Sequence, residues 1–164
     1  MMPLSKILRP SLDTGVPNVG FAVKKNSDVQ TLSNSTYTKV TFDTELFDTN
    51  NNFASSRFTP TVAGQYFFHA DLHHYNSASG ATTLRNTVFY KNGSAHTHTL
   101  RTENSSPGYT IKVACTAIIE MNGTGDYVEV YARGTFSSGT YQIADDSNSG
   151  FSNGNIFIGF RLGV

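Results

Sequence analysis

Five histidines, His69, His73, His74, His96 and His98, are the side chains of this sequence best suited to bind a transition metal. His96 and His98 are two residues apart, and in a β-strand this spacing places both imidazoles on one face. Any alternating polar face has the same spacing, however, and the sequence identifies neither a third ligand nor a group that would orient the rings. We therefore expect no metal at this pair.

The run Asp145-Asp146-Ser147-Asn148 offers the oxygen ligands that calcium prefers. It lacks the ordered carboxylate spacing and the closing glutamate of a helix-loop-helix calcium loop. We expect this segment to be a solvated loop. No cofactor is predicted for the chain.

Catalytic motifs are missing from the sequence: it has no G-x-S-x-G, no phosphate-binding G-x-x-x-x-G-K and no G-x-G-x-x-G. The single cysteine, Cys115, lies in the apolar run Ile111 to Ile119, where we expect a small buried side chain and not a nucleophile. Two carboxylates could still meet in space without any motif. With only 15% charged residues, we expect a binding or structural protein and not an enzyme.

Charge and hydropathy exclude several partners. Twelve basic and twelve acidic residues cancel, so the chain has no net field that would attract nucleic acid. No apolar run approaches the roughly 20 residues of a membrane helix, and Met1 to Asn18 lacks the apolar stretch of a secretory signal. We expect a protein made in the cytoplasm that binds neither nucleic acid nor membrane.

The sequence predicts that β-strands are the elements that position any functional site. From Val19 onward, short runs of Val, Ile, Thr, Tyr and Phe alternate with Asn, Gly and Ser clusters, which is typical of an all-β sandwich or barrel. Nine strands are predicted: Val19 to Lys24, Val29 to Leu32, Thr38 to Phe42, Gly64 to Tyr75, Thr82 to Lys91, Ala95 to Arg101, Tyr109 to Met121, Asp126 to Phe136 and Ile156 to Leu162.

Residues 1–18 differ from the rest of the chain. They contain Pro3, Pro10 and Pro17 and show no periodicity, so they predict an extended N-terminal arm before a domain of residues 19–164. Within the domain, Asn92-Gly93 and Asn122-Gly123 supply the residues that favour positive φ, and both pairs are predicted to end hairpins.

Three short motifs occur in order along the domain. They are Phe58 followed after five residues by Gly64-Gln65-Tyr66-Phe67-Phe68, then Gly125-Asp126-Tyr127-Val128-Glu129-Val130, and finally Phe157-Ile158-Gly159-Phe160-Arg161-Leu162. This pattern resembles the signature of the complement globular-head family, which shares its jelly roll with tumour necrosis factor. The resemblance implies a jelly-roll β-sandwich and a threefold assembly.

The same resemblance places Tyr66, Phe68 and Phe160 either in the core or at a trimer interface. Tyr66 and Phe68 are two residues apart in a strand, so they share a face, and filling the sandwich core is the simpler of their two roles. Twelve phenylalanines and eight tyrosines are generous for one small core, which favours an aromatic face around a threefold axis.

A short arm followed directly by such a jelly roll also resembles many small bacteriophage proteins. This implies a virion structural protein, a homotrimeric decoration or cement protein that binds the major capsid protein or other virion proteins on the capsid surface. The arm residues expected to contact a neighbouring protein are Leu4, Lys6, Ile7, Leu8, Arg9 and Leu12. Two alternatives remain open: a tail-fibre or receptor-binding tip that recognises a host surface glycan, and an isolated lectin-like or calcium-binding module.

Overall fold

The computed structural model describes residues 19–26, 29–78, 81–102, 111–144 and 154–163. These residues form strands and turns without a helix. The strands are β1 (Gly20–Lys25), β2 (Gln30–Thr31), β3 (Thr38–Lys39), β4 (Thr44–Asp48), β5 (Phe53–Ala54), β6 (Arg57–Phe58), β7 (Gly64–Asn76), β8 (Thr82–Lys91), β9 (Ser94–Arg101), β10 (Ile111–Met121), β11 (Val128–Phe136), β12 (Tyr141–Ile143) and β13 (Asn155–Arg161).

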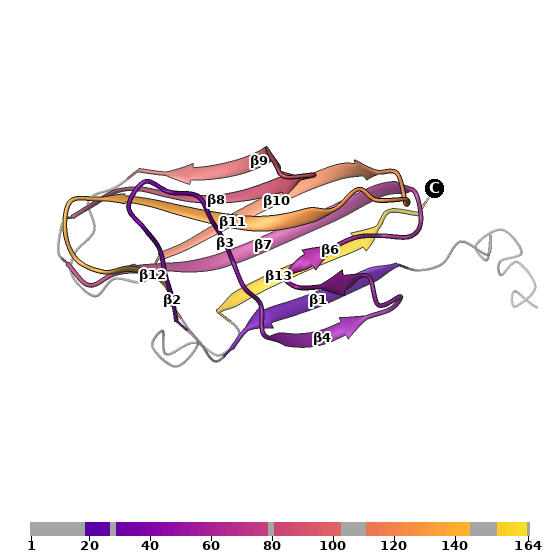
Figure 1. Ribbon diagram of the computed structural model, residues 1–164, viewed down its shortest axis with the longest axis horizontal. Coiled ribbons are helices and arrows are strands. Elements are labelled where there is room, and N and C mark those ends of the chain that lie inside the picture. The colour runs from indigo at the N-terminus through magenta and orange to yellow at the C-terminus, as the bar shows by residue number, and fades with distance from the viewer. Residues whose placement is uncertain (1–18, 27–28, 79–80, 103–110, 145–153, 164) are drawn as a thin grey trace, which may run out of the picture.

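Two antiparallel sheets pack face to face, and their long strands run along the long axis of the molecule (Figure 1). We call the seven-stranded sheet, β2-β12-β7-β13-β1-β4 with β10 beside β7, sheet A. The six-stranded sheet, β5-β6-β11-β8-β9 with β3 beside β11, is sheet B. The expected all-β sandwich is therefore confirmed.

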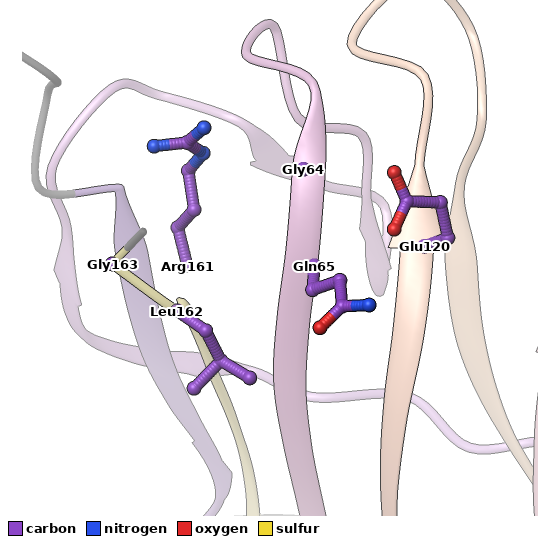
Figure 2. A pocket seen from close by; sticks show the side chains of 6 residues that line it. All are labelled: Gly64, Gln65, Glu120, Arg161, Leu162 and Gly163. Carbon is purple, nitrogen blue, oxygen red and sulfur yellow. The ribbon is translucent and has the colours of Figure 1, made fainter.

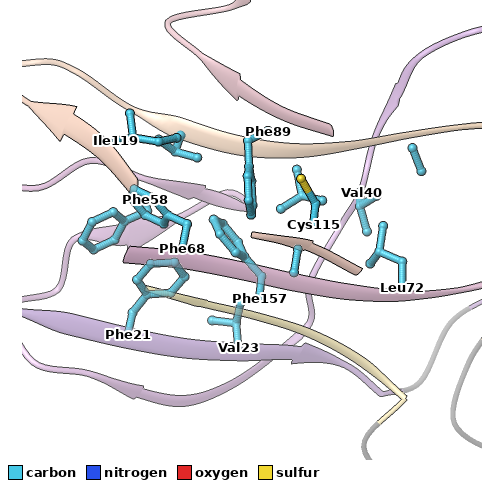
Figure 3. Close-up of a cluster of buried hydrophobic side chains, with 14 of the residues drawn as sticks. Phe21, Val23, Val40, Phe58, Phe68, Leu72, Phe89, Cys115, Ile119 and Phe157 are labelled. Carbon is cyan, nitrogen blue, oxygen red and sulfur yellow. The ribbon is translucent and has the colours of Figure 1, made fainter. Parts of the chain in front are cut away.

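Aromatic rings fill the space between the sheets (Figure 3). Phe21 of β1 stacks on Phe58 of β6 with ring centroids 4.3 Å apart, and it meets the edge of Phe157 at 4.8 Å. Gly159 leaves the room for these rings, because a Cβ built there would lie 2.7 Å from atoms of both Phe21 and Phe68. Rings from both sheets thus form one continuous core.

Cys115 lies in the same core at 1% exposure, as expected for a small buried side chain. Burial raises the pKa of its thiol, and its Sγ lies 3.6 Å from the carbonyl oxygen of Thr97. Both features disfavour the thiolate that a nucleophile requires.

The nine predicted strands all have counterparts, and Thr82–Lys91 has the predicted bounds. The third is shorter than predicted and ends at Lys39. Four strands were not predicted: β4, β5, β6 and β12. Three of these are only two or three residues long, and a pairing that short leaves no periodic pattern in the sequence.

One of the two hairpin predictions is wrong. Asn92 and Gly93 both have positive φ and connect β8 directly to its partner β9, as predicted. At Asn122-Gly123, however, the chain passes from sheet A to sheet B, because β10 pairs with β7 while β11 pairs with β8. Asn122 Oδ1 accepts hydrogen bonds from the backbone N–H groups of Thr124 and Asp126, which stabilises this crossing turn.

Candidate assembly surface

The described residues contain no group of three or more His, Cys, Asp or Glu side chains that could hold a metal. His96 and His98 lie on exposed β9, where Phe89 pairs with Thr97 and Tyr90 with Ala95. This β-bulge interrupts the alternation that would have put both imidazoles on one face.

The Asp145-Asp146 segment and residues 1–18, with their proposed contact side chains, lie outside the described residues. The described part of the chain also contains no helix that could span a membrane.

Tyr66 and Phe68 of β7 point into the core and are fully buried. They lie 6.1 Å apart with their rings nearly parallel, and the Tyr66 hydroxyl donates to the carbonyl oxygen of Val62 at 2.8 Å. Phe160 of β13 lies on the opposite, outer face of sheet A and is 42% exposed. The structure therefore separates the three residues that the sequence had grouped.

A row of large apolar side chains crosses the outer face of sheet A. Phe67 of β7 lies between two neighbours, because it pairs with Ile118 of β10 on one side and with Phe160 of β13 on the other. The rings of Phe67 and Phe160 stack with centroids 5.0 Å apart. Ile118 is 58% exposed, so this row presents its apolar surface to solvent.

The adjacent positions extend this surface toward the edge of the sheet. Ile158 of β13 pairs with Ala22 of β1, which in turn pairs with Phe47 of the edge strand β4. Phe47 is 50% exposed, and its neighbour Leu46 is 53% exposed. We call Phe67, Ile118, Phe160, Ile158 and Phe47 the apolar face of sheet A.

Polar groups on this face are paired with each other. His69 Nδ1 lies 3.0 Å from Thr116 Oγ1, directly beside Phe67 and Ile118 along the two strands. Further along, Lys112 Nζ and Asp71 Oδ2 form an ion pair at 2.9 Å. Covering the face would therefore leave His69 Nδ1, Lys112 Nζ and Asp71 Oδ2 with partners, whereas Asp71 Oδ1 has none among the described residues.

A groove of about 330 Å³ lies at the end of the apolar face (Figure 2). It is lined by Gly64, Gln65, Glu120, Arg161, Leu162 and Gly163. Gln65 pairs with Glu120 across β7 and β10. This pair lies two residues along the strands from the pair of Phe67 and Ile118, and therefore on the same outer face. Arg161 Nε donates to the carbonyl oxygen of Ala63 at 2.9 Å, which fixes the guanidinium at the rim. The groove thus adds a polar border to the apolar face.

A second polar cluster lies inside the sandwich and ties the sheets together. His74 of β7 is fully buried, with Nδ1 2.8 Å from the Tyr141 hydroxyl and Nε2 3.0 Å from Thr87 Oγ1 of β8. Burial, followed by the positive charge of Arg85, lowers the pKa of His74 to about 3, and burial raises the pKa of Tyr141. Both side chains are neutral near pH 7 and closed to solvent, so the cluster is structural.

Phe67 and Ile118 are the residues that the sequence did not single out. Tyr66, Phe67 and Phe68 are consecutive aromatics, so hydropathy does not reveal which of them points outward. In the strand Ile111–Met121, the alternation of Val113, Cys115 and Ile119 against Lys112, Thr116 and Glu120 marks the outer positions, and Ile118 interrupts it as an apolar residue on the polar side. This apolar residue at an outer position was the sequence signal that could have identified the apolar face.

Solved structures share this architecture. No protein-family model and no curated protein matches the sequence. The globular domain of zebrafish complement 1qA is 18% identical, with 90% of this chain and 98% of that chain covered and a TM-score of 0.59. Murine APRIL at pH 5.0 is 10% identical, with 89% and 100% covered and a TM-score of 0.58. Eiger TNF from S. frugiperda is 10% identical, with 90% and 94% covered and a TM-score of 0.59.

These similarities confirm the jelly-roll fold of the complement globular-head and tumour necrosis factor type. At such low identity they establish the fold alone.

Proposed function

We propose that this chain is a virion structural protein, a homotrimer that decorates and stabilises a bacteriophage capsid. The observation that carries the assembly is the exposed apolar row of Phe67, Ile118 and Phe160 on three adjacent strands of sheet A. Contiguous apolar surface of this kind, bordered by polar residues, is typical of an interaction site. A second copy of the chain is the partner that we propose for it.

The positions of the apolar groups support a head-to-tail contact between copies. Among the described strands, the row begins on β10, which pairs only with β7 and forms one edge of sheet A, whereas Leu46 and Phe47 lie on β4 at the opposite edge. If the β4 edge of one copy packs on the row of the next, the two contacting surfaces differ, and such a head-to-tail contact forms a ring when its rotation closes and an open filament when it does not. The resemblance to the complement globular-head family implies that this ring has three members.

Attachment to a capsid is the finer part of the proposal. It is supported by the resemblance of the arm and jelly roll to small phage proteins, and by a composition whose polarity comes from Ser, Thr and Asn instead of charge. In this proposal Leu4, Ile7, Leu8 and Leu12 bind the major capsid protein or another virion protein, and Lys6 and Arg9 add salt-sensitive contacts. The protein would be made in the host cytoplasm and act on the capsid surface, without catalysis and without a cofactor.

A receptor-binding tip that recognises a host surface glycan is the second candidate. One observation favours it: tyrosine and arginine side chains gather on the outer face of sheet B, which a trimer built on sheet A would leave accessible.

Sedimentation equilibrium tests the trimer. At micromolar concentration we expect a particle of three times the 17.9 kDa chain mass. The variant Ile118→Asp places a charge in the apolar face without touching the core, so it should sediment as a folded monomer. The matched control is Leu100→Asp, which alters a side chain of similar exposure on sheet B and should remain trimeric. A monomeric native protein, or a trimeric Ile118→Asp variant, would contradict the proposal.

A further inference from the structure

The outer face of sheet B carries a group of tyrosines unlike anything on sheet A. Tyr90 of β8 and Tyr131 of β11 stack with ring centroids 3.9 Å apart. Tyr37, which precedes β3, packs its ring against Tyr90 at 6.0 Å and is 38% exposed. We call these three residues, together with Tyr127, the tyrosine patch. Tyrosine rings combine apolar faces with a hydroxyl that both donates and accepts hydrogen bonds.

Positive charge surrounds the tyrosine patch. The guanidinium of Arg57 lies 3.9 Å from the Tyr127 ring centroid, and that of Arg133 lies 5.3 Å from the Tyr37 ring centroid. Lys39 and Arg57 both contact Glu129 Oε1 at 2.8 Å. Glu129 is the one carboxylate among these contacts, so three cations face one anion and leave two positive charges in excess.

Glu129 holds this arrangement in place. Its side chain is only 3% exposed, and the Tyr131 hydroxyl lies 3.4 Å from Oε2. Burial alone would raise the pKa of Glu129, but the hydrogen bonds from Lys39 and Arg57 outweigh it and hold the pKa below its usual range. The carboxylate is therefore charged at neutral pH and fixes both cations beside the rings.

Hydrogen-bonding capacity beneath Tyr37 remains unused. Asn86 is 1% exposed and donates from Nδ2 to the Tyr37 hydroxyl at 3.1 Å, yet its Oδ1 has no partner among the described residues. Arg133 Nε is likewise buried without a hydrogen-bond acceptor there. Buried polar atoms are normally satisfied, so these two atoms leave polar capacity unpaired among the described residues at the Tyr37 end of the patch.

We infer that the tyrosine patch binds an acidic saccharide. The apolar face of a sugar ring can pack on the exposed ring of Tyr37, and sugar hydroxyls can bond the Tyr37 hydroxyl, which Asn86 Nδ2 orients from below. Carboxylate or sulfate groups pair with guanidinium groups such as that of Arg133 in charge-assisted hydrogen bonds. The excess positive charge distinguishes an acidic sugar from a neutral one.

This inference gives the second candidate function a site and a ligand class, and it rests on that candidate rather than on the capsid role. Tyrosine and arginine are also common in protein interfaces. The excess positive charge beside the rings favours a ligand that carries acidic groups.

Binding to immobilised full-length protein tests the inference with three probes of matched length: a heparin hexasaccharide, hexagalacturonate and neutral maltohexaose. We expect both acidic probes to bind, maltohexaose to bind at least tenfold more weakly, and affinity to fall as salt rises. Tyr37→Ala and Arg133→Gln should each weaken binding at least tenfold. Both residues are partly accessible, so circular dichroism and the melting temperature should remain near those of the native protein.

The matched control is Tyr75→Ala, which removes a half-buried tyrosine of β7 in sheet A and should leave saccharide binding unchanged. Measuring the sedimentation of each variant separates this test from that of the trimer, because loss of binding by a trimeric Tyr37→Ala variant concerns the patch alone. Failure of both acidic probes to bind, or binding that survives both Tyr37→Ala and Arg133→Gln, would overturn the inference. Equal binding of maltohexaose would overturn the acidic specificity.

Discussion

Phe67 and Phe68 are neighbours in β7, yet their side chains lie on opposite faces of sheet A. Phe67 stacks on Phe160 at 5.0 Å on the outer face, whereas Phe68 is fully buried and lies 6.1 Å from both Phe89 and Phe157. The two-residue period of a strand produces this division. It lets one strand supply both the core and the proposed contact with another copy.

The division predicts different consequences for the same substitution at adjacent positions. Phe68→Ala should lower the free energy of unfolding by about 3 to 5 kcal/mol, because it removes a ring from a closely packed core. Phe67→Ala should cost the fold much less and act mainly on association. Chemical denaturation and sedimentation of both variants measure the two effects. An unchanged stability in Phe68→Ala would contradict the strand register described above.

The buried imidazole of His74 predicts a loss of stability in mild acid. The folded protein holds the pKa of His74 at about 3, against 6.5 in an unfolded chain, so below pH 6.5 the unfolded state binds a proton that the folded state rejects. The free energy of unfolding should therefore fall as pH decreases from about 6.5 toward 3. Between pH 6 and 5, before most carboxylates titrate, the slope from this residue should approach about 1.4 kcal/mol per pH unit.

Denaturation curves across this pH range, repeated on two variants, assign the slope to one histidine. His74→Gln keeps one hydrogen-bond donor and one acceptor for Tyr141 and Thr87 but cannot titrate, so its curve should be flatter. His69→Gln changes an imidazole on the outer face of sheet A and should leave the decline in place. An equal slope in native protein and His74→Gln would show that other groups cause the acid sensitivity.

Metal removal should leave stability unchanged. The described residues hold no cluster of three metal-binding side chains, and the Asp145-Asp146 segment lacks the carboxylate spacing of a calcium loop. Thermal melts with and without a chelator, and with added calcium, measure this directly. A chelator-induced loss beyond about 2 kcal/mol would reveal a site that stabilises the fold by mass action.

Long elements were predictable from sequence because each spans several periods of alternation. Val128, Val130 and Ala132 of β11 are fully buried against the partly accessible Tyr131, and this alternation runs through the strand that the sequence predicted as Asp126 to Phe136. β5 and β6 have two residues each and exist because Phe53 and Phe58 meet across a turn. Such a pairing depends on tertiary contacts that no local pattern records.

The candidate surfaces were less predictable for a related reason. Tyr66 and Phe160 were named together, but which face each occupies depends on the register of β13 with β7. The tyrosine patch was not predicted, since Tyr37 and Tyr90 are 53 positions apart in the chain and meet only when β3 and β8 flank β11. Surfaces that combine distant strands require the fold before they can be recognised.

Deleting residues 1–18 tests the capsid part of the proposed function. The core and the apolar face of sheet A are built from later residues, so the truncated protein should fold and form trimers like the native chain. The deleted segment carries Leu4, Ile7, Leu8 and Leu12 as apolar anchors, which a soluble monomer would have little reason to expose. We therefore expect the truncated trimer to lose attachment to capsids that lack the protein, as measured by co-sedimentation.

A full-length variant with Lys6 and Arg9 changed to Gln should show only a modest, salt-dependent weakening of capsid binding, because exposed ion pairs contribute about 0 to 1 kcal/mol each. Undiminished capsid binding by the truncated protein would refute the decoration mechanism and favour the receptor-binding tip.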